Sequence, residues 1–171
     1  MNYKMLMEIK DLLDNYDLVV CEKSMPKGKV IPPHWHNYLE LEIIMDGRAI
    51  QVYNGETYQL CRGSMYMLSY YDYHSFSATD EVTLTNIRFK ESLLNSSIAR
   101  HINIKQNCLI HKFNESEIKE IISKIKVLYR ETLSPQIYTD IIKSSIISEL
   151  VVSLIRSSSD LTYKNMPQLI Q

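Results

Sequence analysis

The pattern of apolar and polar positions changes twice along the chain of 171 residues. Apolar side chains near helical spacing predict a short helix or a docked arm over residues 1–16. Residues 17–90 consist of short β-prone runs separated by turn signals, which is typical of a compact sandwich or barrel. After Lys90 the period becomes helical, so we expect a helical segment over residues 91–156.

One hairpin can be placed from the sequence. Asn54-Gly55 stands between the β-prone runs 50–53 and 57–60. Asn-Gly at this position favours a two-residue turn because both residues tolerate a positive φ. The sequence therefore predicts two antiparallel strands joined at residues 54 and 55.

Two helices are expected in the C-terminal half of the chain. Asn114 followed by Glu117 predicts an N-cap with a capping box. Ser134-Pro135 has the preferred order for the start of a second helix, predicted to end near Arg156. That helix is apolar over much of its circumference and needs cover on two sides. The second packing partner of this helix is either another subunit, in a homodimer that forms through the C-terminal helices, or another part of the same subunit.

Composition excludes several classes of partner. Lys and Arg number 19 against 20 Asp and Glu, so no basic field is present that would hold nucleic acid by itself. The charged residues of the N-terminal segment fit neither a signal peptide nor a membrane span, so we expect a cytoplasmic protein without a membrane partner. The three cysteines, Cys21, Cys61 and Cys108, are far apart and predict reduced thiols.

The segment 34–45 alternates in an unusual way. In an extended strand one face would carry His34, His36, Tyr38, Glu40 and Glu42, and the other Leu39, Leu41, Ile43 and Met45. A face rich in His and Glu suggests a cavity. The apolar face then needs a packing partner, and we expect the C-terminal helices on the outside of the barrel.

The spacing of these residues resembles the first cupin motif. The matching positions are Gly28, His34-Trp35-His36, Glu40 and Gly47. Of the second motif, Gly63 and His74 are kept, whereas Ser69, Tyr71 and Ala78 replace the usual proline, glycine and asparagine. The resemblance implies a mainly β fold with C-terminal α-helices: a cupin double-stranded β-helix, or jelly-roll, barrel followed by two or three helices.

The same resemblance implies a candidate metal site. It brings His34, His36, Glu40 and His74 together inside the barrel, where metal-dependent cupins bind iron, manganese, nickel or zinc. The alternative is a hydrogen-bonded polar cluster that lines a pocket without any metal and without a cofactor. The loosened second motif favours this alternative.

A second resemblance covers residues 17–156. The runs 34–47, 58–63, 73–76 and 87–89 are similar to the sensor domain of AraC-family transcriptional regulators. That resemblance implies a domain without enzymatic activity that binds a small-molecule effector, for instance a carbohydrate, inside the barrel. In that family, helices after the barrel dimerise and a separate helix-turn-helix domain binds DNA.

The expected effector pocket combines the two resemblances. Its predicted lining residues are His34, His36, Tyr38, Glu40, His74 and Arg88. For Arg88 two interpretations stay open: it faces the barrel, where it could bind an anionic group, or it forms a surface salt bridge. Trp35 lies on the other strand face and is expected to pack against a helix.

The residues after Ser157 do not contain a helix-turn-helix. We interpret residues 157–171 as the start of a linker to a DNA-binding domain that is absent from this chain, which would be an isolated sensor or a fragment. Two other hypotheses remain at this stage. One is a metal-dependent cupin enzyme, a dioxygenase or sugar isomerase, with the four metal-ligand candidates. The other is an interaction module whose barrel is only a scaffold.

Overall fold

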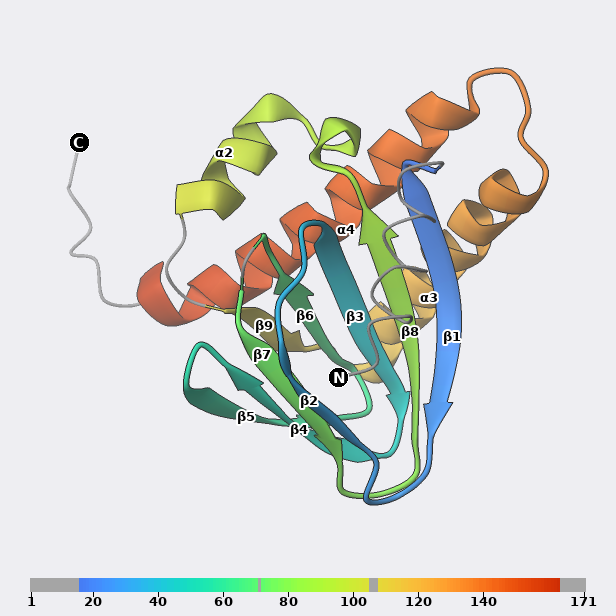
Figure 1. Ribbon diagram of the computed structural model, residues 1–171. Coiled ribbons are helices and arrows are strands. Elements are labelled where there is room, and N and C mark those ends of the chain that lie inside the picture. Colours follow the sequence, from blue (N-terminus) through green and yellow to red (C-terminus); the bar gives the residue numbers. More distant parts are fainter. Residues whose placement is uncertain (1–15, 71, 105–107, 164–171) are drawn as a thin grey trace.

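A computed structural model describes residues 16–70, 72–104 and 108–163 of the chain (Figure 1). The predicted N-terminal helix lies outside these residues, apart from Tyr16. The elements in chain order are β1 (Leu18–Met25), β2 (Val30–His34), β3 (Leu39–Asp46), β4 (Arg48–Tyr53), β5 (Glu56–Cys61), β6 (Ser64–Leu68), β7 (His74–Ala78), β8 (Val82–Phe89), the 3-10 helix η1 (Glu91–Leu93), α2 (Ser96–Ile104), β9 (Leu109–Lys112), α3 (Glu115–Leu133) and α4 (Thr139–Tyr163).

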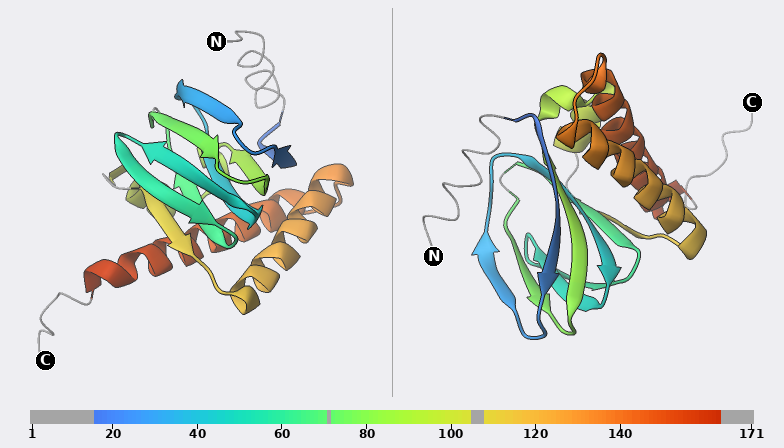
Figure 2. Two further views of the ribbon diagram at one scale, coloured as in Figure 1. Left: turned by 90° about the horizontal axis from the view of Figure 1, so that it is seen from below. Right: turned by 90° about the vertical axis from the view of Figure 1, so that its right-hand side faces the viewer.

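The strands form two antiparallel sheets that face each other. One sheet has the order β1-β8-β3-β6-β9 and the other β2-β7-β4-β5. This order is that of a jelly roll. Helices α3 and α4 lie across the outer face of the five-stranded sheet (Figures 1 and 2). The predicted fold class, a mainly β jelly roll with C-terminal helices, is confirmed.

The predicted hairpin is present as β4 and β5. Tyr53 pairs with Glu56, and the two residues between them have positive φ angles, 46° at Asn54 and 92° at Gly55. Such a turn matches the right-handed twist of the strands that it joins. The four-stranded sheet therefore ends in a hairpin that the sequence alone locates.

The strand predicted to run continuously from His34 is interrupted. His34 ends β2 in the four-stranded sheet, whereas Leu39 begins β3 in the five-stranded sheet. Residues 35–38 cross from one sheet to the other. The strict alternation predicted from His34 onward is therefore wrong for the crossing and correct for β3 itself.

Along β3 the two faces have different partners. Leu39, Leu41 and Ile43 belong to a buried cluster that includes residues of α3 and α4, while Ile44 belongs to a second cluster between the sheets. Glu40 and Glu42 are buried on the inner face. The expectation that the apolar face packs against the C-terminal helices is confirmed.

The start of α3 is as predicted, and the start of α4 is not. Asn114 accepts hydrogen bonds from the backbone of residues 116 and 117, and Glu117 accepts one from the Asn114 backbone, which completes the capping box. Ser134, however, is the C-cap of α3, and its N–H donates to the carbonyl oxygen of Arg130. Helix α4 begins at Thr139, whose hydroxyl accepts from the Gln136 backbone.

The end of α4 also differs from the prediction. The helix continues through residues 157–160 to Tyr163, so the predicted break after Arg156 is wrong. Serine has only a modest helix penalty, and neither glycine nor proline interrupts this stretch. The remaining part of the predicted linker, residues 164–171, lies outside the described residues.

Part of the apolar second half of α4 is buried within its own subunit. Ile147, Leu150, Val151 and Leu154 are buried together with residues of the five-stranded sheet, α2 and α3. Ile146, Val152 and Ile155 of the same half are only partly buried, so a second subunit remains a prediction for this helix. Exposed apolar side chains gather instead where α3 joins α4. We call this set the connection patch; it comprises Tyr129, Leu133, Ile137, Tyr138, Ile141 and Ile142.

The segment after Lys90 is not wholly helical. Residues 109–112 form β9, which extends the five-stranded sheet beside β6. The chain then approaches Gly63 closely, because the Phe113 N–H donates to the Gly63 carbonyl oxygen at 3.0 Å. A Cβ atom at Gly63 would lie 2.6 Å from the Phe113 oxygen, and the φ angle of 87° also favours glycine. Gly63 thus allows the helical segment to dock on the barrel.

Candidate functional site

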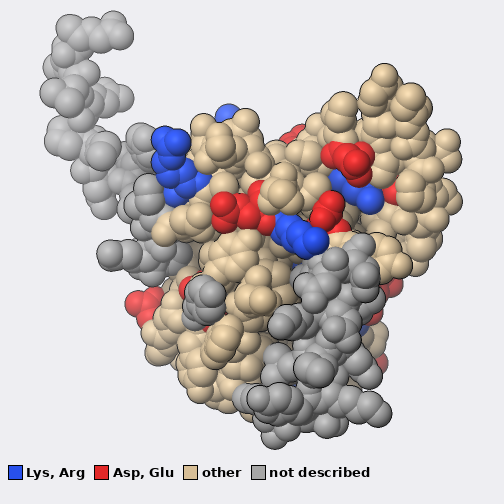
Figure 3. Space-filling view, turned by 45° about the horizontal axis from the view of Figure 1, so that its top comes forward, with Lys and Arg blue, Asp and Glu red and all other residues tan. Residues whose placement is uncertain are grey.

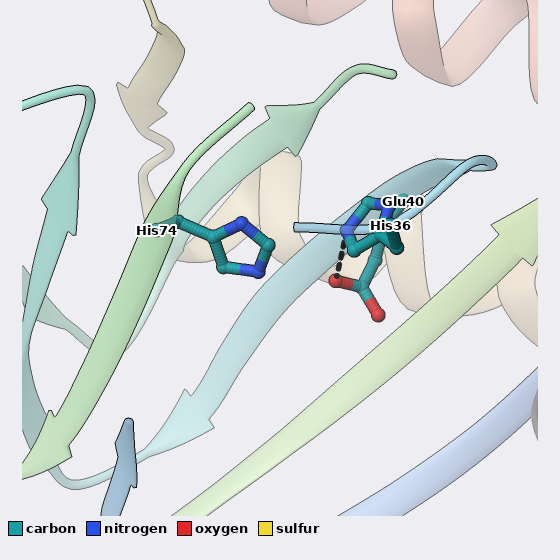
Figure 4. A group of neighbouring side chains, drawn as sticks. All are labelled: His36, Glu40 and His74. Atoms are coloured by element: carbon teal, nitrogen blue, oxygen red, sulfur yellow. Dashed lines mark ion pairs between the residues drawn. The ribbon is translucent and has the colours of Figure 1, made fainter. Parts of the chain in front are cut away.

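The residues predicted to form the pocket come together at one end of the barrel. They belong to β2, the 35–38 crossing, β3, β7 and β8. The ring of His74 has its centroid 4.2 Å from that of His34 and 5.0 Å from that of His36. Figure 4 shows His36 and Glu40 facing His74 across the interior. Segments far apart in sequence therefore contribute to one polar cluster.

All three imidazoles are oriented by backbone carbonyl groups. In each, Nδ1 lies 2.8–2.9 Å from a carbonyl oxygen two residues away. The pairs are His34 with Pro32, His36 with Tyr38 and His74 with Asp72. Because a carbonyl oxygen only accepts, Nδ1 is the donor, and in the neutral ring Nε2 keeps its lone pair.

Glu40 is the centre of the cluster. Its Oε1 accepts hydrogen bonds from Asn86 Nδ2 at 2.6 Å and from Arg88 Nε at 3.1 Å. Its Oε2 lies 3.3 Å from Nε2 of His36. Burial raises the pKa of Glu40, but the neighbouring His36 and the charges of Lys23 and Arg88 outweigh burial and hold the pKa well below its ordinary value. Glu40 is therefore an ionised carboxylate inside the barrel.

Glu42 lies on the same face of β3 as Glu40, two residues further along the strand. It is hydrogen-bonded by the Tyr66 hydroxyl and by Asn86, and Lys23 Nζ lies 3.6 Å from Oε1. Burial and the charge of Glu40 raise the pKa of Glu42 despite these partners. The Asn86 amide donates one hydrogen to each carboxylate, which links the two acids.

Arg88 faces the barrel interior, so the alternative of a surface salt bridge is wrong. Its side chain is 10% exposed and pairs with Glu40 through Nε. The guanidinium carbon lies 5.9 Å from the centroid of the Tyr38 ring, which itself stacks on His36 at 4.0 Å. Tyr38 therefore stacks on the His36 imidazole and lies within cation–π distance of the Arg88 guanidinium.

Three buried polar atoms have no hydrogen-bond partner among the described residues. They are both amide atoms of Gln51 and Nε2 of His36, which meets Oε2 of Glu40 only as the ion pair at 3.3 Å. The pKa of His74 is lowered to about 4, chiefly by burial, so its ring is neutral at physiological pH. Buried polar atoms are usually satisfied, and an exception indicates a missing ligand, ion or water.

The donor set fits a transition-metal ion. The ligand atoms of His36, Glu40 and His74 all lie within 4.8 Å of one another. Two imidazole nitrogens and one carboxylate oxygen suit zinc, nickel, manganese or iron. The carbonyl groups that hold Nδ1 of each ring provide the outer hydrogen bonds typical of metal-binding histidines. His34, predicted as a fourth ligand, lies beside His74 but outside this group of three.

A cavity of about 160 Å³ opens next to the cluster. Its lining includes Tyr53, Ser69, Tyr70 and Asp72. Tyr53 pairs with His74 across β4 and β7, and the Asp72 carbonyl orients the His74 ring. A larger cavity, of about 420 Å³, lies away from the histidines, between β1 and α3. Of these two cavities the smaller is therefore the one lined by neighbours of His74, although none of the three histidines lines either cavity.

Some residues of the cluster do not follow from the motif. Lys23, Gln51 and Tyr66 lie on strands that carry no ligand position of the cupin motif. Only the alternation of inward positions along β1, β4 and β6 could have indicated them. Trp35, expected to pack against a helix, is 52% exposed and belongs to neither buried cluster.

Comparison with known proteins identifies the family. The model of the AraC-like ligand binding domain matches residues 18–151. The chain belongs to this family. The AraC-like domain is also 35% identical over 72 residues to the HTH-type transcriptional activator RhaS of Yersinia pestis; the match covers 42% of this chain and 26% of that protein.

One solved structure supports the fold of the AraC-like domain. An apo ToxT variant from Vibrio cholerae superposes with a TM-score of 0.62 at 12% identity, over 92% of this chain and 68% of that chain. A cupin superfamily protein from Desulfitobacterium hafniense gives a TM-score of 0.42 at 13% identity, over 44% of this chain and 69% of that one. No helix within the described ranges has the length and apolar character needed to cross a membrane.

Replacement of Arg88 by Met tests the buried ion pair. Because it leaves the Glu40 carboxylate buried without its guanidinium partner, we expect the free energy of unfolding to fall by about 3 kcal/mol. The matched control is Arg48→Met, which breaks the exposed pair with Asp80 and should lower the free energy of unfolding far less. Urea unfolding of both variants measures the difference. Equal losses for the two variants would show that the Glu40 pair has no special role.

Proposed function

We propose that this chain is the ligand-sensing domain of an AraC-type transcriptional regulator. In this proposal a small polar effector, such as a carbohydrate, binds inside the barrel beside His36, Tyr38, Glu40, His74 and Arg88. The observation that carries the proposal is the buried cluster inside the barrel, where the side-chain nitrogen and oxygen atoms of His36, Glu40 and His74 lie within 4.8 Å of one another. Family membership supports a binding domain over a metal-dependent dioxygenase or sugar isomerase.

Strand β3 provides a path from the site to the helices. Glu40 faces the polar cluster, while its neighbours Leu39 and Leu41 pack against the cluster that includes α3 and α4. An effector that moves Glu40 must therefore also move apolar side chains beneath the helices. A ligand changes the equilibrium between two states only by its difference in affinity for them, and this strand couples the two regions.

DNA contact is assigned in this proposal to a helix-turn-helix domain outside this chain. The RhaS relatives are HTH-type, that is helix-turn-helix, transcriptional activators. The net charge of −1 gives the present chain no electrostatic affinity for a phosphate backbone. A regulator of this kind works in the cytoplasm, in agreement with the location expected from the sequence.

We also propose that the domain forms a homodimer, with the connection patch as the contact surface. The apolar side chains of this patch include Ile137 and Ile141, which are 80% and 62% exposed. The turn that presents them is held in place, because Thr139 donates a hydrogen bond to the buried Glu131. A rigid, contiguous apolar surface is typical of a protein interface. This assignment moves the predicted dimer contact from the middle of α4 to its first turns.

The same site supports a second proposal, that His36, Glu40 and His74 bind a transition-metal ion. The lone pairs of both Nε2 atoms and Oε2 of Glu40 are close enough to share one ion. A bound ion would supply a Lewis-acidic centre for the effector. The residues of the chain would still orient and enclose that effector.

Thermal unfolding in the presence of candidate effectors tests the sensor proposal. Monosaccharides, sugar acids, amino acids and dicarboxylates are added separately to the purified chain. A compound present at about 100 times its Kd stabilises by about 2.7 kcal/mol, which corresponds to a shift in Tm of roughly 5–10 °C. His74→Gln should abolish the shift. The control is His111→Gln on β9, where His111 pairs with Met65 of β6. This variant should keep the shift in Tm.

Failure of every compound in this set to change the Tm of the native sequence would contradict the sensor proposal. An equal shift in both histidine variants would place the effector elsewhere. The cavity between β1 and α3 would then be the next candidate.

Metal analysis by mass spectrometry tests the second proposal. The chain is purified without a polyhistidine tag and without chelators, then incubated with zinc, nickel, manganese or iron and desalted. We expect about one ion per chain and at least a tenfold weaker affinity in His36→Ala and Glu40→Gln. His111→Ala should bind as the native sequence does. Metal contents near zero for the native sequence would rule the site out.

Sedimentation velocity tests the homodimer. We expect the native sequence to sediment as a dimer and Ile141→Lys as a monomer, because a lysine in the apolar contact would have to be desolvated. Val30→Lys changes an apolar side chain of similar exposure on β2, outside the connection patch, and should remain dimeric. A native sequence that stays monomeric at high concentration would contradict the proposal.

A further inference from the structure

The cavity between β1 and α3 lies outside the barrel interior. Its floor belongs to the outer face of the five-stranded sheet, where Thr85 of β8 pairs with Glu22 of β1. The next residue of β8, Asn86, donates to the carboxylates inside the barrel, so Thr85 points outward, toward α3. The volume of this cavity, about 420 Å³, is in the range of small-molecule sites.

One wall of the cavity is apolar. It consists of Val20 of β1 and of Ile125 and Tyr129 of α3. Ile125 belongs to the buried cluster beneath the helices and Val20 packs against that cluster, whereas Tyr129 is 49% exposed. An apolar group of a ligand would be removed from water against these side chains. We call them the apolar wall.

A buried hydroxyl group on the floor of the cavity has no partner. Thr85 is 2% exposed, and none of the side-chain hydrogen bonds among the described residues involves its hydroxyl. The equally buried hydroxyl of Thr139, by contrast, donates to Glu131 and accepts from the Gln136 backbone. Because a buried hydroxyl without a hydrogen bond is costly, the one at Thr85 indicates a polar group that enters the cavity.

Two opposite charges line the cavity without pairing. Glu22 lies on the β1 side and Lys126 on the α3 side, and both are exposed. Neither side chain forms an ion pair or a hydrogen bond with another residue of the described chain. Lys124 on the same helix, by contrast, is paired with Glu149. A ligand that carries one charge of each sign would find a partner for both.

The combination of these groups selects one class of ligand. An anion without an ammonium group would meet Glu22 with no charge to match it, and a cation without a carboxylate would meet Lys126 in the same way. A sugar would place hydroxyl groups against the apolar wall, where they find no hydrogen-bond partner. A free α-amino acid with a branched or aromatic side chain carries an ammonium group, a carboxylate and an apolar group on one carbon atom.

We infer that the cavity between β1 and α3 is a second ligand site and that it binds a free α-amino acid with an apolar side chain. The ammonium group pairs with Glu22, and the carboxylate pairs with Lys126 and accepts a hydrogen bond from Thr85. The side chain of the amino acid lies against the apolar wall. This site does not depend on the proposed effector site, because the cavity and the barrel interior lie on opposite faces of β8.

Titration calorimetry of the purified chain tests the inference. The probes are L-leucine, L-phenylalanine, glycine, and two analogues of leucine: 4-methylpentanoic acid lacks the ammonium group and 3-methylbutylamine lacks the carboxylate. The variants of the site are Glu22→Gln, Lys126→Gln and Thr85→Val. The matched control is Lys119→Gln, the same substitution at an exposed position of α3 that does not line the cavity. His74→Gln distinguishes this site from the barrel interior.

We expect L-leucine or L-phenylalanine to bind the native sequence, Lys119→Gln and His74→Gln with the same Kd. Glu22→Gln and Lys126→Gln should each raise that Kd about threefold or more, since each removes one exposed ion pair. Thr85→Val should raise it as well, without lowering the Tm of the free chain, because no protein hydrogen bond is lost. Glycine and the two leucine analogues should bind more weakly than leucine.

Two results would overturn the inference and leave the sensor function untouched. They are the absence of binding by either apolar amino acid, and a Kd that is unchanged in Glu22→Gln or in Lys126→Gln. Loss of amino-acid binding in His74→Gln, with normal binding in the variants of the cavity, would also overturn the inference. That result would assign the amino acid to the barrel interior and support the sensor function.

Discussion

The ionised carboxylate of Glu40 inside the barrel is the constraint on which the rest of the site depends. A buried charge of this kind is tolerated only with charged and hydrogen-bonding partners. Arg88 and Asn86 supply them from β8, and His36 approaches from the crossing between the sheets. The requirement to satisfy one carboxylate thus fixes the register of β3 against β8 and the position of the chain that carries His36.

Strand β3 connects this polar interior to the helical layer. On its inward face, Glu40 and Glu42 are linked by hydrogen bonds to Asn86. On its outward face, Leu39, Leu41 and Ile43 pack against α3 and α4. Because both layers are closely packed, a displacement of the strand cannot be absorbed on one side alone. Gly63 has a related role at the edge of the sheet, where it lets the chain entering α3 approach the barrel.

The sequence was most informative where local chemistry determines structure. The Asn54-Gly55 turn and the Asn114 capping box depend on nearby residues only, and both were located correctly. The start of α4 was misplaced because Ser134 and Pro135 fit a helix end as well as a helix start, and the hydrogen bonds of Thr139 decide between them. Strand β9 was missed because its four residues are strand-like only beside β6, a contact distant in sequence.

In the site, too, the sequence indicated some residues and not others. The motif indicated His36, Glu40 and His74, and the structure brings their ligand atoms together, whereas Gln51 could not be found because an isolated glutamine on a strand gives no sign of lacking a partner.

The hydrogen bonds of Glu40 also limit what the site can bind. Its Oε1 is occupied by Asn86 and Arg88, so only Oε2 is left for a metal ion or an effector. A metal held by this oxygen and two imidazoles would have three protein ligands, fewer than the four of a closed structural zinc site. The remaining coordination positions would be open to oxygen atoms of a bound effector. A metal ion at these three residues would therefore be compatible with the small effector of the proposed sensor, and the two proposals for the site do not compete.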